Sequence, residues 1–99
     1  MKNTHTITKA IYKSFAEQIA EDAIGRNYIS DVFYVTDKEV EHRLEVSIII
    51  YRDESSGEVT DINDVWWDCC TIETNEDGEP LLKINDFDIA LLYKELMGR

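Results

Sequence analysis

The segment HRLEVSIIIYR, residues 42–52, alternates its side-chain types with a period of two. One face of this segment holds Leu44, Val46, Ile48 and Ile50. The other face holds Glu45, Ser47, Ile49 and Tyr51. Successive side chains of a β-strand point to opposite faces, so the pattern predicts a strand whose aliphatic face lies on a core. Such a strand needs neighbouring strands and a covering layer, and the flanking sequence predicts both.

Further β-type segments and turn signals lie on both sides of residues 42–52. Strands are expected at 28–36, 58–74 and 79–84, with turns at 37–41, 53–57 and 75–78. The segment 58–74 is either one long strand or two pieces broken near Asn63. The dipeptide Asp77-Gly78 is a strong hairpin signal. Short connections favour antiparallel pairing of strands that follow each other in the sequence.

A helix is predicted at each end of the chain. Over residues 8–24, apolar side chains recur every four positions at Ile7, Ile11, Phe15, Ile19 and Ala23, which gives one hydrophobic face. A threonine at 4, 6 or 8 is expected to cap this helix, and Gly25 is expected to end it. The second helix is expected over 86–97, with Asp86 as N-cap and Asp88 in the first turn, where the helix dipole favours acids.

This order predicts an α+β fold: a helix, three or four antiparallel strands, and a helix. Each helix has one apolar face, so we expect a two-layer sandwich with both helices on one face of the sheet. The 99 residues fit a single domain, 1–99. The helix–three-strand–helix order resembles that of double-stranded-RNA-binding domains. Their activity is not expected here, because residues 53–79 are acidic and offer no counterpart to the basic loops of those domains.

The charge of the chain is strongly negative and unevenly distributed. There are 21 acidic and 10 basic residues, which gives a net charge of −11. Residues 1–52 contribute −1 of this, and residues 53–99 contribute −10. Such a field repels phosphate groups, so direct binding to nucleic acid or to an anionic membrane is not expected. A basic protein partner is compatible with it, although acidity of this kind also serves solubility alone.

The cysteines and histidines show no pattern typical of a metal or cofactor site. Cys69 and Cys70 are adjacent, so a disulfide between them would be strained, and reduced thiols indicate a cytoplasmic protein. His5 and His42 lack paired spacing; His5 is expected on a frayed N-terminus and His42 at the start of a strand, and neither has a visible partner in the sequence. The N-terminal MKNTHTITKA lacks the apolar run of a signal peptide. The longest unbroken apolar stretch, 48–51, is too short to span a membrane.

The tract DINDVWWDCC, residues 61–70, is the most unusual part of the sequence. In a regular strand, one face would hold Asp64, Trp66, Asp68 and Cys70, and the other Val65, Trp67, Cys69 and Thr71. We assign the Val65 face to the core, which leaves Trp66 on the open face of the sheet together with Ile49 and Tyr51. Large apolar side chains clustered on such a face are typical of an interface. The alternatives are that a loop or the first helix covers them, or that the two faces are exchanged.

The sequence therefore predicts a small, acidic, non-enzymatic protein-interaction module without a cofactor. The candidate binding patch is Trp66, Ile49 and Tyr51. The candidate acidic surface is Asp61, Asp64, Asp68, Glu73, Glu76 and Asp77. A sharper version is a nucleic-acid mimic that occupies the groove of a basic partner, since small acidic proteins of phages and mobile elements resemble this chain in size and charge. The alternatives are an assembly subunit that homodimerises through the open sheet face, and a small enzyme without a recognisable motif.

Overall fold

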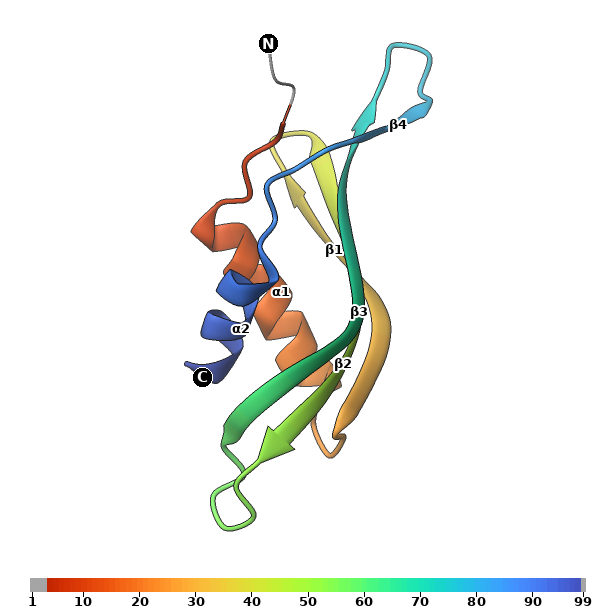
Figure 1. The fold of residues 1–99 in the computed structure, drawn as a ribbon. Helices are drawn as coiled ribbons and strands as arrows, with labels where there is room; N and C mark the ends of the chain where they lie inside the picture. Colours follow the sequence, from red (N-terminus) through yellow and green to blue (C-terminus); the bar gives the residue numbers. More distant parts are fainter. Residues whose placement is uncertain (1–3, 99) are drawn as a thin grey trace.

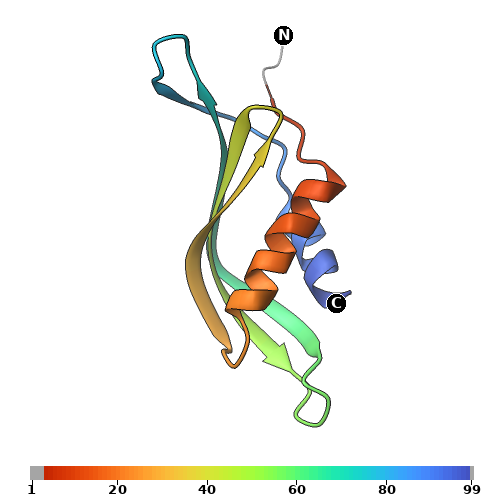
Figure 2. The same ribbon diagram turned by 180° about the vertical axis from the view of Figure 1, so that it is seen from behind.

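The computed structural model describes residues 4–98, which form two helices and one four-stranded sheet (Figure 1). In chain order the elements are α1 (Lys9–Asp22), β1 (Tyr28–Asp37), β2 (Val40–Arg52), β3 (Val59–Thr74), β4 (Pro80–Lys83) and α2 (Ile89–Met97). The strands lie in the order β1-β2-β3-β4, and each neighbouring pair is antiparallel. Both helices cover one face of the sheet and leave the other face open (Figure 2). The predicted α+β two-layer sandwich is therefore confirmed, with four strands.

Side-chain caps fix where the two helices begin. Thr8 is the threonine that caps α1, because its hydroxyl accepts a hydrogen bond from an N–H of the first turn. Asp88 caps α2 in the same way, so the prediction that Asp86 is the N-cap was wrong. The Asp86 carboxylate instead accepts a hydrogen bond from the Ile7 N–H at 2.7 Å. It thereby ties the segment before α1 to the segment before α2, a contact between distant parts of the sequence.

A two-residue turn at Lys38 and Glu39 joins β1 to β2. Both residues have positive φ angles, 48° and 69°. This geometry is that of a type I′ hairpin turn, in which glycine is preferred because it lacks a Cβ atom, and asparagine because its short polar side chain tolerates the left-handed region. Other residues carry a cost of roughly 1 kcal/mol each in the left-handed region. The turn therefore matches the twist of the strands at the expense of local backbone strain.

β3 is one continuous strand, and two β-bulges interrupt its pairing with β2. At the first bulge, Trp66 lies opposite Ser47 but Asp64 lies opposite Ile48, so Val65 has no partner across the ladder. The second bulge lies near the start of β3. A bulge inserts one extra residue into the strand. Beyond it, the assignment of odd- and even-numbered residues to the two faces is therefore exchanged.

This first bulge corrects the predicted faces of β3. Trp67 packs against the core, as predicted, and Trp66 is exposed on the open face. Val65 was assigned to the core, but it is 61% exposed because the bulge turns it out of the ladder. Asp64 was assigned to the same face as Trp66, but its partner Ile48 faces the helices, so Asp64 lies on the helix side.

The core fills the space between the helices and the sheet. Its largest fully buried aliphatic and aromatic side chains are Phe15, Ile19, Ile29, Leu44, Ile48 and Leu92. The predicted aliphatic face of residues 42–52 is buried throughout. Three rings surround Phe87, those of Tyr12 at 5.4 Å, Trp67 at 5.3 Å and Phe15 at 6.3 Å between centroids. This aromatic cluster joins α1, β3 and the segment before α2.

Candidate functional site

The structure brings the three residues of the predicted patch together on the open face. Trp66 of β3 and Tyr51 of β2 have 52% and 44% of their surface exposed. Ile49 lies between them along the sheet and is half-buried, with Tyr28 of β1 and Asn63 of β3 as its cross-strand neighbours. Neither helix covers this face, so the alternatives of a covering helix and of exchanged faces are excluded for these residues.

β1 adds three exposed side chains that were not predicted to belong to the patch. Tyr28, Val32 and Tyr34 alternate with the buried Ile29 and Phe33. The alternation was visible in the sequence, but residues 28–36 lacked a clear apolar face because both faces carry large apolar side chains. The open-face patch is hereafter the set Tyr28, Val32, Tyr34, Ile49, Tyr51 and Trp66.

Polar and charged side chains surround the open-face patch. The hydroxyls of Ser30 and Ser47 form a hydrogen bond of 2.8 Å beside Trp66. One step further along the sheet, Glu45 and Asp68 lie directly opposite each other. The Arg43 guanidinium is 3.5 Å from the Glu45 carboxylate. A cross-strand pair of like charges is destabilising. Two carboxylates against one guanidinium leave this part of the open face with an excess of negative charge next to its aromatic rings.

The six residues of the predicted acidic surface do not form one surface. Asp61 and Asp68 lie on the open face. Asp64 lies on the helix side because of the bulge, and its charge acts with burial to raise the pKa of the Tyr93 hydroxyl in α2, burial being the larger cause. Glu73 also lies on the helix side, where its carboxylate pairs with the His5 imidazole. Glu76 and Asp77 lie at the tip of the β3–β4 hairpin.

Both histidines have partners, which were not visible in the sequence. Besides its pairing with Glu73, His5 bonds through its backbone to the segment before α2. His42 is buried, and its Nδ1 atom lies 2.9 Å from the Thr71 hydroxyl. Burial lowers the pKa of the His42 imidazole below its ordinary value, and Asp37 opposes this shift. No local pattern indicates these partners, because each is more than 25 positions away in the chain.

A polar cluster connects His42 to Cys69; His42 and Thr71 in it are buried, and Asn85 and Cys69 are half-buried. The Asn85 amide donates to the Thr71 hydroxyl at 3.1 Å and to the Cys69 sulfur at 3.5 Å. Burial raises the pKa of the Cys69 thiol to about 11, and a thiol with such a pKa is a poor nucleophile. Both cysteines are free thiols. Residues 4–98 contain no group of three or more His, Cys, Asp and Glu side chains placed to hold a metal ion.

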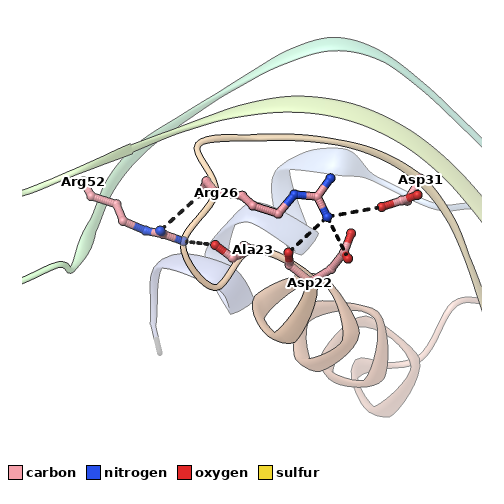
Figure 3. Close-up of polar contacts among 5 residues, drawn as sticks. All are labelled: Asp22, Ala23, Arg26, Asp31 and Arg52. Carbon is pink, nitrogen blue, oxygen red and sulfur yellow. Dashed lines mark hydrogen bonds and ion pairs between the residues drawn. The ribbon is translucent and has the colours of Figure 1, made fainter.

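Two arginines anchor the connection between α1 and β1 (Figure 3). The Arg52 guanidinium donates to the carbonyl of Ala23, the C-cap of α1, at 3.1 Å, and to the Arg26 carbonyl in the connection that follows at 3.2 Å. The Arg26 guanidinium lies 3.0 Å from the Asp22 carboxylate and 3.9 Å from the Asp31 carboxylate. The start of β1 is thereby held against the end of α1.

Two further observations bound the function. In the described part of the chain, neither helix is long and apolar enough to cross a membrane. Comparison of the chain with protein-family models, with curated proteins and with solved structures gives no match. The function is therefore inferred from the surface of this molecule alone, and the open-face patch is its most distinctive feature.

Proposed function

We propose that the protein is a non-enzymatic interaction module that binds a basic partner protein through the open-face patch. The observation that supports this most strongly is the half-exposed Trp66 among tyrosines on an uncovered sheet face. The solvated face of an antiparallel sheet normally carries polar side chains. Tryptophan and tyrosine are enriched at the energetic centres of protein interfaces. The reduced cysteines favour a cytoplasmic location for this module.

The charges around the patch favour a partner that carries arginine or lysine. Within residues 4–98, Arg43 is the one cation that forms an ion pair with the opposed carboxylates of Glu45 and Asp68. An arginine from a partner can pair with such carboxylates and also stack on an adjacent ring such as Trp66. The net charge of −11 would attract a basic protein over longer range and speed its association.

A homodimer through the same face is the alternative. Each copy would bring a net charge of −11 and its own Glu45–Asp68 pair with a single Arg43, so the dimer would double the excess of carboxylates on this face. We therefore favour a basic partner over a second copy. Sedimentation of the wild type and of Trp66→Glu tests this choice. A wild-type dimer that Trp66→Glu converts to monomer would favour the second copy.

Imitation of a nucleic acid is a more specific form of the proposal, and the shape of the molecule supports it. The extents are 53 × 22 × 21 Å, so the molecule is a rod. Its carboxylates lie on both faces and at the hairpin tips. The net charge is about one per 5 Å of the long axis, against about one per 1.7 Å in duplex DNA. This weaker charge density favours a contact that combines charge with the aromatic patch over imitation of phosphates alone.

Affinity capture from a cell lysate with matched variants tests the proposed function. Immobilised wild type is compared with Trp66→Ser and with Ile84→Ser, which removes a large apolar side chain outside the patch that is 75% exposed, against 52% for Trp66. We expect the wild type and Ile84→Ser to retain the same basic protein, and Trp66→Ser to lose it. Retention should fall steeply with added salt, which screens the charges. The captured protein is identified by mass spectrometry and its binding is then repeated with purified material.

The outcome that contradicts the proposal is equally specific. If the protein retained by the wild type is also retained by Trp66→Ser, the open-face patch is not the binding surface. If a retained protein is neutral or acidic and insensitive to salt, the partner is not selected by charge. Either result leaves the fold intact and removes the proposed function.

A further inference from the structure

The outer edge of β1 presents backbone groups that no other strand uses. The Asn27 carbonyl accepts the Ile50 N–H at 2.7 Å, directly across the register, so the odd-numbered residues of β1 are those that bond to β2. The N–H and C=O groups of the even-numbered residues therefore point outward. The Gln18 side chain donates to one of them, the Tyr34 carbonyl, at 2.9 Å. Those of Ser30 and Val32 have no hydrogen-bond partner within residues 4–98.

β1 is the less protected of the two long edges of the sheet. β3 also has an outer edge, because β4 covers only its last four residues. Two bulges interrupt β3, however, and bulges disfavour pairing with another strand. β1 runs for 10 residues without a register shift and contains neither proline nor lysine. A regular exposed edge of this kind accepts an added strand.

An acidic notch flanks this edge on the helix side. It is lined by Gln18, Glu21, Asp22, Asp31, Val32 and Phe33. Arg26 is placed between the Asp22 and Asp31 carboxylates, and its single charge leaves the notch negative (Figure 3). The Oδ2 atom of Asp22 is buried and has no hydrogen-bond partner in the described chain. The Asp22 carboxylate also raises the pKa of Asp31, so the two acids crowd each other.

We propose that an extended segment of the basic partner adds to β1 as a fifth strand and places an arginine or lysine side chain in the acidic notch. This deepens the proposed function and rests on it for the positive charge of the partner. Alternate side chains of the added strand would point to opposite faces. A basic residue opposite Asp31, which faces the notch, therefore has neighbours beside Ser30 and Val32 on the open face. The recognised segment alternates basic with apolar residues.

A second copy of this chain is a poorer occupant of the same edge. Antiparallel pairing of two β1 strands would bring a second Asp22 and a second Asp31 toward the notch. Like charges at close range repel, and neither copy has a spare cation there beyond Arg26 in the described chain. A basic segment supplies the missing charge, which decides between the two occupants.

A peptide titration followed by backbone amide NMR tests strand addition. The probe is a short capped peptide in which arginine alternates with valine, and its control has glutamate in place of each arginine. We expect the arginine peptide to slow amide hydrogen exchange at Ser30 and Val32, and the control to leave it unchanged. Asp31→Asn should weaken binding about tenfold, as for loss of one charged hydrogen bond. Asp77→Asn, which removes the same charge at the distant hairpin tip, should change it less than about twofold.

Val32→Pro supplies a second variant, because it removes an outward N–H and leaves the β1–β2 ladder intact. It should abolish protection at Ser30 while the protein stays folded. Strand addition is overturned if the arginine peptide protects neither amide, or if both peptides act equally. A response of the Trp66 indole without protection at Ser30 overturns strand addition alone and leaves the open-face function standing. Protection in the free protein together with a dimeric mass would assign the edge to a second copy and also overturn it.

Discussion

The adjacent residues Trp66 and Trp67 offer the sharpest test of the sheet described above. They have the same chemistry and neighbouring positions, but Trp66 is 52% exposed on the open face, whereas Trp67 packs against the core and lies 5.3 Å from the Phe87 ring. Replacement of each by alanine should therefore give very different losses of folding stability. The pair controls for composition, strand propensity and distance along the chain.

The expected magnitudes follow from burial. Truncation of a fully buried aromatic side chain costs about 3–5 kcal/mol, and Trp67 is only partly buried, so we expect roughly 2–3 kcal/mol for Trp67→Ala. In a domain of this size that lowers the unfolding temperature by about 10–20 °C. Trp66→Ala removes a surface contact and should stay within about 0.5 kcal/mol of the wild type.

Thermal unfolding followed by circular dichroism measures both losses, and fluorescence gives a second readout. Each variant retains one tryptophan, so its emission reports one position. The emission of Trp66, measured in Trp67→Ala, should be accessible to the neutral quencher acrylamide, and that of Trp67, measured in Trp66→Ala, should be shielded from it. Equal losses of stability, or a larger loss for Trp66→Ala, would falsify the register of β3 and with it the open-face patch.

Three further predictions concern the backbone and a buried imidazole. The double variant Lys38→Asn with Glu39→Gly should raise the unfolding free energy by about 1 kcal/mol in chemical denaturation, since it relieves two positive φ angles; a loss would contradict the type I′ assignment. Deletion of Val65 should leave cooperative unfolding intact, because it removes the bulge and restores regular alternation along β3. Deletion of Asp68 is the control and should abolish cooperative unfolding, because it moves the residues on one side of it to the wrong faces. Burial lowers the pKa of His42 below 6.5, so the unfolded state binds a proton more readily than the folded state. The contribution of the neutral His42 to folding stability is therefore complete above pH 6.5 and is lost as the pH falls below it. The drop in unfolding temperature between pH 7.5 and 5.5 should be smaller in His42→Gln, and an identical drop would exclude His42 as its source.

The open-face patch was predictable in part, and the reason lies in strand alternation. The alternation in residues 42–52 is enough to predict that Ile49 and Tyr51 lie on the face opposite the core. Trp66 followed because its neighbour Trp67 was assigned to the core. The Tyr28, Val32 and Tyr34 side chains were missed, although the same period of two runs through their strand. A strand with apolar residues on both faces does not reveal which face is covered.

The acidic residues were predicted less well, because the charge of a residue does not show which face of the sheet its side chain occupies. Asp64 and Asp68 were assigned to one face by counting, and a single unpaired residue, Val65, separated them. Glu73 was read as a free surface acid, but it pairs with His5 across 68 positions of the chain. The acidic notch between Asp22 and Asp31 was not found, since nothing local in the sequence links the end of a helix to the edge of a strand.

By itself, the sequence determined the order of the elements, the covered face of β2 and the sign of the electrostatic field. These depend on local periodicity and composition, which are properties of the chain before it folds. Only the tertiary structure decided the phase of β3 across its bulge, the partners of both histidines and which strand edge stays open. Each of these depends on register or on contacts between distant residues, which the geometry of packing selects and no local pattern encodes.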